Sequence, residues 1–342
     1  MSNTQPRRAW ARRLAALVSA ALLVPLAACG GGSAASSGDG ERVTLKLADP
    51  GNNGLLAYAK KTGVLEEELD EVGADVEWGG SFASFTATID ALRSGDVNVL
   101  EGAISPVIGY LAENDDLRIF SVADRTTDPQ APIGDGLVVP GDSDIETIDE
   151  VIGRKVAVNR GGRGEYLLLK ALDQAGIDHD EVERVYLNPQ DAAGALASGS
   201  VDAWWAIVRG YPAAVANGAR TIVTNTDVDD DDLNMFAARE EIVEANPEAL
   251  RTFQRVLAEL AEEAREEPEK FQNVFQDSGP AAVEGDALKR DIEVQRYTQP
   301  QRLVTDDDLA TVQAVADYFA DNGLVSTRID AAAAVTHLGA DE

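Results

Sequence analysis

Apolar and polar positions between Gly153 and Asp202 follow first the period of a strand and then the period of a helix. Beyond Glu165 the apolar residues recur at helical spacing until Gly176, a residue typical of a helix C-terminus. The predicted elements are, in order, a strand at 153–159, a glycine turn at 160–164, a helix at 165–176, a strand at 182–187, a helix at 191–197 and a strand at 200–205. This β-α-β-α-β order predicts a mostly parallel sheet flanked by helices.

The N-terminal half repeats the same design of a strand, a small polar loop and a helix. The strands are expected at 43–49, 75–78, 96–100 and 117–122. In the third repeat, Ser105 precedes Pro106, and proline suits the first position of a helix. Ser105 is therefore expected to cap that helix from outside it.

A chain of 342 residues is long enough for two domains, here called lobes, and we expect it to cross between them near residues 125–140. The acidic run Asp227–Asp232 is interpreted as a loop or a second crossover, because so many like charges need solvent. A returning strand at 233–238 and acidic, amphipathic helices follow. We expect residues 42–130 to begin the first lobe, 131–228 to form the second, and 229–342 to complete the first with C-terminal helices.

The first 28 residues are typical of an export signal. Arg7, Arg8, Arg12 and Arg13 precede the apolar run 14–24, which is too short to span a membrane as a mature helix. Leu26-Ala27-Ala28-Cys29 matches a lipobox, so we expect cleavage before Cys29, lipidation of its thiol, and a lipidated tether at 29–41. An ordinary secretory signal with a chance cysteine is the alternative. The first interpretation places the protein on the outer face of the cytoplasmic membrane, in the cell envelope or periplasm.

The net charge of the chain restricts the classes of partner that it can bind. Removing those four arginines changes the formal net charge from -31 to -35. Such a surface argues against nucleic acid and anionic membrane faces as partners. Cys29 is the only cysteine, so we expect no disulfide and no cysteine metal site, and the sequence offers no cofactor motif. Either adaptation to high salt or a nucleotide bias towards arginine and alanine codons would explain the acidic, arginine-rich composition.

Four loops that precede helices are candidates for one binding cleft: 52–53, 81–85, 101–106 and 161–165. In open parallel sheets, ligands bind at the edge where such loops gather. Unpaired N–H groups at helix starts suit a bound oxyanion. Ser84 and Ser105 serve either as helix caps or as ligand contacts, and one residue can do both.

The segments Val-Tyr-Leu at 185–187 and Gly-Ser-Val-Asp-Ala-Trp at 199–204 resemble the ABC-transporter substrate-binding proteins for aliphatic sulfonates, taurine and nitrate. The resemblance covers residues 43–248. It implies an α/β fold of two lobes, the type 2 periplasmic-binding-protein or Venus flytrap fold. It also implies a monomer that captures a small organic anion and delivers it to an ABC permease.

The resemblance implies specific contacts. Asn52 or Asn53 matches the amide of the family's first loop, and Ser84 and Ser105 match the helix starts of the second and third. Phe85, at the end of the second loop, is a further candidate contact. The fourth loop departs from the pattern, because Gly162 and Arg163 replace two hydroxyl residues; Arg163 either supplies the missing donors or points to solvent. A second departure is Ile207-Val208-Arg209, where the family has a Trp-acidic-Pro or Trp-Ala-Pro element, and it puts the ligand in question.

Three further residues leave alternatives open. Trp204 and Trp205 alternate across a strand, so one is expected to face the core and the other the cleft, where Trp205 would pack on an alkyl chain. The alternative is that both are partly buried aromatic residues at a sheet edge. Glu165 suits the ammonium of a zwitterion such as taurine, or is an ordinary surface charge.

Catalysis finds little support in the sequence. His179 and His337 are the only histidines, and neither lies on a candidate loop. We therefore expect no enzyme. The ligand could instead be nitrate, another small anion or a pyrimidine-like molecule. A cationic or aromatic ligand is a further alternative. An enzyme resembling thiamine-pyrimidine synthases is the less favoured alternative.

Overall fold

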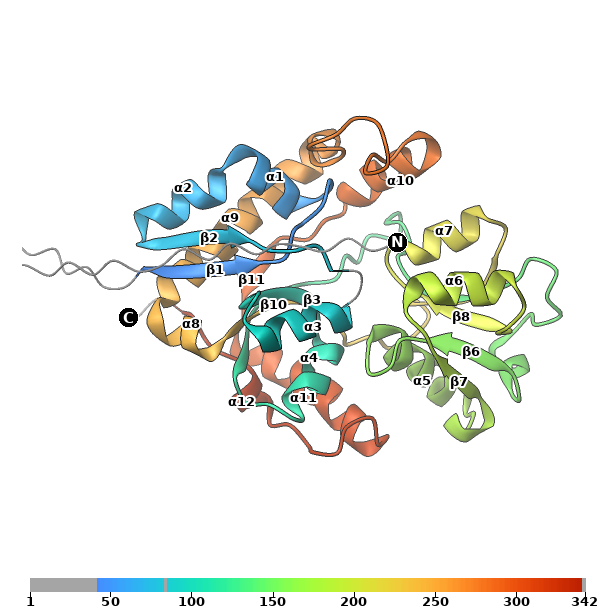
Figure 1. The fold of residues 1–342 in the computed structure, drawn as a ribbon. Helices are drawn as coiled ribbons and strands as arrows, with labels where there is room; N and C mark the ends of the chain where they lie inside the picture. Colours follow the sequence, from blue (N-terminus) through green and yellow to red (C-terminus); the bar gives the residue numbers. More distant parts are fainter. Residues whose placement is uncertain (1–41, 83–84, 340–342) are drawn as a thin grey trace, which may run out of the picture. The chain divides into compact units, whose positions relative to one another are not determined.

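A computed structural model describes residues 42–82 and 85–339. The predicted signal peptide, Cys29, the tether and Ser84 lie outside the described residues. Figure 1 shows two groups of strands with helices packed on both sides of each. Within the described residues, no helix combines the length and the apolar character that a membrane crossing needs.

The second lobe is built on a five-stranded sheet with the order β7-β6-β8-β5-β9. Strand β6 pairs parallel with β7 and β8, whereas β5 pairs antiparallel with β8 and β9, so the sheet is mixed. The strands are β5 (Gly136–Val139), β6 (Lys155–Val158), β7 (Glu183–Tyr186), β8 (Ala203–Ala206) and β9 (Arg220–Thr224). The helical elements are η1 (Ile148–Val151), α5 (Arg163–Ala175), η2 (His179–Glu181), α6 (Pro189–Ala197) and α7 (Gly210–Ala216).

Alternation along β8 places its two tryptophans on opposite faces of this sheet. Trp204 packs with Leu196 of α6 and Tyr211 of α7, and Trp205 packs in the cluster that contains Tyr166 of α5. This is the two-residue period of a strand that is covered on both faces. Helices α6 and α7 therefore cover one face, and α5 covers the other (Figure 1).

The first lobe contains a four-stranded sheet with the order β11-β4-β10-β3 and the parallel pair β1-β2. Strand β10 runs antiparallel to both β3 and β4, because it returns from the second lobe. The strands are β1 (Val43–Leu47), β2 (Ala74–Trp78), β3 (Val99–Ala103), β4 (Leu117–Ala123), β10 (Asn234–Arg239) and β11 (Gln301–Leu303).

Helices cover both faces of the first lobe's strands. Met235 and Ala237 of β10 pack in the cluster that holds α4 and α11, and Phe236 and Ala238 pack in the cluster that holds α9. The helices are α1 (Leu55–Thr62), α2 (Val64–Glu71), α3 (Phe85–Ser94), α4 (Ile104–Leu111), α8 (Glu240–Ala245), α9 (Pro247–Glu266), η3 (Pro268–Phe271), α10 (Gly285–Gln295), α11 (Asp306–Asp321) and α12 (Ala331–Ala334).

Two segments carry the chain between the lobes. The first crossover (residues 124–135) joins β4 to β5, and the second crossover (residues 225–233) joins β9 to β10. They leave the second lobe side by side, because Gly136 of β5 pairs with Thr224 of β9. The Asn225 N–H also donates to the Asp135 carbonyl.

Asn98 joins the pair β1-β2 to the four-stranded sheet. Its Oδ1 accepts from the Lys46 N–H at 2.7 Å, and its Nδ2 donates to the Thr44 carbonyl at 2.9 Å. The Asn98 N–H donates to the Lys46 carbonyl as well. Since Asn98 is buried, these bonds are made without competing water, and they align the ends of β1 and β3.

Replacement of Asn98 by Ala is expected to lower the free energy of unfolding by about 1–3 kcal/mol, because two partly buried backbone groups of β1 lose their partners. Asn322→Ala is a matched control, since Asn322 donates only locally to the Tyr318 carbonyl. Urea titration of both variants measures the difference. Equal losses would contradict the role of Asn98.

Candidate functional site

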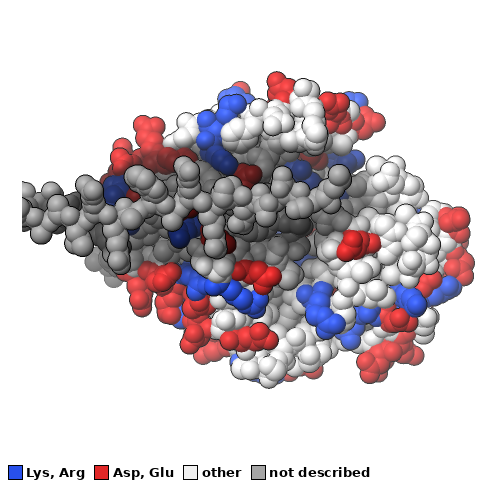
Figure 2. Space-filling view, in the orientation of Figure 1, with Lys and Arg blue, Asp and Glu red and all other residues white. Residues whose placement is uncertain are grey.

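Two cavities open beside the loops that follow the strands. The larger one, here called the α6/α7 groove, has a volume of about 1050 Å³. It lies between α6 and α7, with Trp204 of β8 beneath them, and Phe82 of the first lobe contributes to its lining. Figure 2 shows a largely uncharged surface in the region of α6 and α7, in contrast to the many acidic residues elsewhere on this face.

Small residues make the α6/α7 groove possible. Ala193 and Ala197 line it from α6, and Ala213 and Ala214 line it from α7. The start of α7 lies very close to the floor, because a Cβ placed on Gly210 would be 2.9 Å from the Trp204 ring. Glycine at 210 therefore lets the helix begin directly over the indole.

The segment Ile207–Arg209 forms one end of the groove. Val208 has a φ of 48° and a side chain that is 67% exposed. A β-branched residue rarely adopts this left-handed conformation, which costs about 1–3 kcal/mol. The Val208 N–H donates to Asp135 Oδ1 at 3.0 Å, so a buried carboxylate of the first crossover holds the strained residue in place.

The smaller cavity, of about 440 Å³, lies in the first lobe. Asn53, Glu101, Asp124 and Gln301 contribute to its polar lining. The side chain of Glu101 reaches solvent, yet the surrounding protein excludes enough water to raise its pKa, and a hydrogen bond with Asn234 offsets part of that effect.

Asn52 and Asn53 hold the segment that follows η3. Asn52 Oδ1 accepts from the N–H groups of Phe275 and Gln276, and its Nδ2 donates to the carbonyls of Gln276 and Ala281. These contacts use the hydrogen-bonding capacity of the buried amide. Asn53 Oδ1 accepts from the Asn273 N–H, and Asn53 also lines the smaller cavity, so it alone of the two lines a cavity.

The expectation that Ser105 caps α4 from outside is wrong. The helix begins at Ile104, and Ala103 stands at the cap position. Ser105 is fully buried inside the first turn, where its hydroxyl donates to Asp232 Oδ2 at 2.8 Å and its N–H donates to Oδ1 at 2.7 Å. A carboxylate from the second crossover thus supplies the acceptor for this helix start.

Asp227–Asp232 lies in the second crossover, as expected, but the premise that all its charges need solvent is wrong. Asp230 and Asp232 are only 8% and 2% exposed. Their burial is compensated by Arg163, whose Nη2 lies 2.6 Å from Asp230 Oδ2 and whose Nη1 donates to the Asp232 carbonyl. Arg125 pairs with Asp230 at 2.5 Å. Buried carboxylates require such partners, because an unpaired buried charge is costly.

Arg163 connects both crossovers to the second lobe. Its Nε donates to Asp135 Oδ2 at 2.6 Å, while its Nη atoms hold Asp230 and Asp232. Neither of the two expected roles, anion donor or solvent-facing charge, describes these contacts. We call Arg163 and its three acids, Asp135, Asp230 and Asp232, the crossover cluster.

Charge in the crossover cluster shifts two pKa values. Burial opposes the charge of Arg163, but the carboxylates of Asp135, Asp230 and Asp232 outweigh it and raise its pKa above the ordinary value. Burial raises the pKa of Asp232 to about 6, although Arg163 and Ser105 act in the opposite direction.

Side chains of the protein itself accept hydrogen bonds from the N–H groups of the turn before α5. Asn159 Oδ1 accepts from the Gly164 N–H, and Glu165 Oε2 accepts from the Gly161 N–H. A Cβ on Gly162 would collide with the Asn159 side chain at 1.8 Å. Glu165 is buried and also accepts from the Tyr186 hydroxyl, so it is a structural carboxylate in this conformation.

The remaining predicted contacts fall in different places. Trp205 is 1% exposed within the core, and Trp204 is the tryptophan that lines the α6/α7 groove. Phe85 begins α3. His179 and His337 line neither described cavity. No cluster of His, Cys, Asp and Glu suited to a metal ion occurs among residues 42–82 and 85–339.

Sequence reasoning missed the α6/α7 groove and Asp135. The departure at Ile207-Val208-Arg209 was the available signal, because it marks the end of β8 where Val208 and Arg209 line the groove. The alanines of α6 and α7 gave no signal of a groove, because alanine favours helices in general.

Comparisons with known proteins point to one family. The model for the family described as NMT1/THI5 like matches residues 81–271. An aliphatic sulfonates-binding protein of Escherichia coli (strain K12) is 30% identical over 185 residues, which are 54% of this chain and 56% of that protein. One of Bacillus subtilis (strain 168) is 26% identical over 92% of each chain.

Among solved structures, the alkanesulfonate-binding protein SsuA from Xanthomonas axonopodis pv. citri bound to MOPS superposes with a TM-score of 0.71. The match covers 86% of this chain and 99% of that one at 22% identity, so it shows the fold. It confirms the predicted two-lobed periplasmic-binding-protein architecture. The relatives are named as binding proteins, which agrees with the prediction of no enzyme.

Replacement of Arg163 by Ala is expected to destabilise the protein by about 3–5 kcal/mol at pH 7, because Asp230 and Asp232 would remain buried without their main cation. Arg160→Ala is the matched control, since Arg160 is exposed and only stacks on Tyr186. Chemical denaturation measures both. A loss below 1 kcal/mol in Arg163→Ala would refute the crossover cluster as a stabilising feature.

A pH dependence follows from Asp232. Its folded pKa of about 6 exceeds the ordinary value of 3.8, so its protonated form favours folding. This contribution is complete below pH 4 and is lost as pH rises to 6, by up to about 3 kcal/mol. The free energy of unfolding of wild type minus that of Asp232→Asn should therefore fall between pH 4 and 6. A difference that rises over this range would contradict the assignment.

Proposed function

The chain belongs to the NMT1/THI5-like family, and we propose that it is the substrate-binding component of an ABC importer that captures an organic sulfonate. The observation that carries the proposal is the α6/α7 groove, an apolar cavity with Arg209 in its lining, in a chain whose relatives are named for binding aliphatic sulfonates. An apolar site with few polar groups is the usual form of a small-molecule site.

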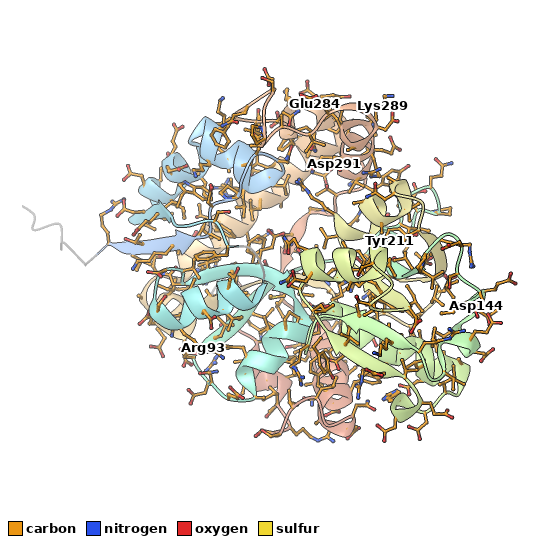
Figure 3. The ribbon with its side chains drawn as sticks, turned by 45° about the vertical axis from the view of Figure 1, so that its right-hand side comes forward. Arg93, Asp144, Tyr211, Glu284, Lys289 and Asp291 are labelled. Atoms are coloured by element: carbon orange, nitrogen blue, oxygen red, sulfur yellow. The ribbon has the colours of Figure 1, made fainter. Side chains whose placement is uncertain are left out.

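Contacts from both lobes support capture by closure. The groove belongs to the second lobe, and Phe82 of the first lobe contributes to its lining. Arg209 Nη2 lies 4.0 Å from Asp291 Oδ2. Figure 3 labels Asp291 on α10, a helix of the first lobe. A ligand in the groove would therefore touch both lobes, and such a ligand favours the conformation in which they approach.

We further propose that the protein is exported and acts outside the cytoplasm, as the signal-like N-terminus and the taurine-binding periplasmic protein among its relatives suggest. Lipidation at Cys29 would then keep it beside its permease as a monomer. Asn53 stays part of the proposal, since it lines the smaller cavity of the first lobe. Site roles for Ser84 and Phe85 are proposed from the resemblance alone.

Nitrate is less well suited to this site than a sulfonate with a carbon chain. The groove presents alanine, leucine and tryptophan surfaces that a small inorganic anion would leave unfilled. A pyrimidine-like ligand has no polar counterpart in the groove beyond Gln190, Asn217 and Arg209 among the described lining residues.

Octanesulfonate at 100 times its dissociation constant is expected to stabilise the protein by about 2.7 kcal/mol, which corresponds to a rise in melting temperature of about 5 °C. Nitrate and an aminopyrimidine at equal concentration should leave it unchanged. Thermal-shift measurement in sulfonate-free buffer compares the three. Stabilisation by nitrate or the pyrimidine alone would overturn the sulfonate proposal.

A further inference from the structure

We propose that the α6/α7 groove is a subsite for the apolar tail of the ligand, with Arg209 as the cation that holds its sulfonate head. This inference rests on the proposed function and narrows it to alkanesulfonates with long or bulky apolar tails, in place of taurine.

The groove runs along β8 and α7. Strand β5 is antiparallel to β8, with Gly136 opposite Ala206 and Val138 opposite Trp204. Pro140 and Gly141 therefore line the end away from Val208 and Arg209. Helix α7 has seven residues and spans about 10 Å between these ends. A tail that enters beside Arg209 has this length available to it.

The groove wall is apolar between its two ends. Ala193, Ala197 and Leu196 come from α6, Ala213 and Ala214 come from α7, and the Trp204 indole lies below. Each methylene moved from water to such a surface contributes about 0.8 kcal/mol when fully buried. Longer chains are therefore expected to bind more tightly until the groove is filled.

Charge in the groove is confined to one end. Among the described residues that line it, Arg209 alone is charged. Its side chain is 64% exposed, and its Nη2 lies 4.0 Å from Asp291 Oδ2, so donors remain for a ligand. A guanidinium offers paired hydrogen bonds to an oxyanion. Gln190 adds an amide to the lining.

The same lining disfavours taurine. With its sulfonate on Arg209 and its carbons directed along the groove, the taurine ammonium would stand two carbons away against apolar wall residues, whereas Asp291, the acid 4.0 Å from Arg209, lies outside the described lining. Loss of hydration without a compensating charge is costly for an ammonium. An alkyl or aromatic group at that position has no such cost.

The test measures chain-length preference by calorimetry on the purified protein with ethanesulfonate, octanesulfonate and octylammonium. Ala197→Leu fills the groove from α6, and Ala193→Leu does so one turn earlier in case the first variant does not fold. Ala216→Leu is the matched control, because Ala216 is exposed on α7 outside the lining. Arg209→Gln tests the head-group contact.

Wild type and Ala216→Leu should bind octanesulfonate at least tenfold more tightly than ethanesulfonate. Ala197→Leu and Ala193→Leu should lose that preference while their affinity for ethanesulfonate stays within twofold. Arg209→Gln should weaken both sulfonates about tenfold or more.

Three outcomes overturn parts of the proposal separately. Equal affinity of wild type for both chain lengths, or equal weakening of both ligands by the leucine variants, would refute the tail subsite and leave sulfonate capture intact. Octylammonium binding as tight as octanesulfonate binding would refute Arg209 as the head-group cation. Binding of neither sulfonate would overturn the proposed function itself.

Discussion

The guanidinium of Arg163 among three carboxylates is the contact on which the arrangement of both lobes depends. It joins the start of α5 to the first crossover through Asp135 and to the second crossover through Asp230 and Asp232. Two of these acids hold a further element, since Asp232 accepts from Ser105 of α4 and Asp135 accepts from Val208. A single cation that is largely enclosed by protein therefore connects the start of α4 in the first lobe to the groove of the second.

Local signals in the sequence predicted the elements well. Strand and helix periods, together with glycines such as Gly176 in the left-handed conformation, located β6, α5, β7, α6 and β8 within a few residues. The predicted start of α4 lay after its actual start at Ile104, because serine followed by proline is typical of a helix cap and a first helical residue. The burial of Asp230 was invisible to local reasoning, because its partner Arg163 lies 67 residues away.

The site was harder to predict than the fold. Nothing in the local sequence distinguished the two adjacent asparagines. Asn52 binds the segment after η3, whereas Asn53 lines a cavity. Trp204 and Trp205 could be placed on opposite faces, but which face holds a groove depends on how α6 and α7 are spaced. The resemblance supplied the architecture and the ligand class, and the departures from it marked where this chain differs.

The pairing of β5 with β9 determines where the second lobe could be cut out and exchanged by protein engineering. Because the strand that enters the second lobe and the strand that leaves it are hydrogen-bonded neighbours, the whole of residues 136–224 is inserted at one point of the first lobe. Such an insert can be exchanged between relatives as a cassette with two adjacent junctions. A cassette placed into this chain would need a cation at the position of Arg163, because Asp135, Asp230 and Asp232 lie outside the insert and remain in place.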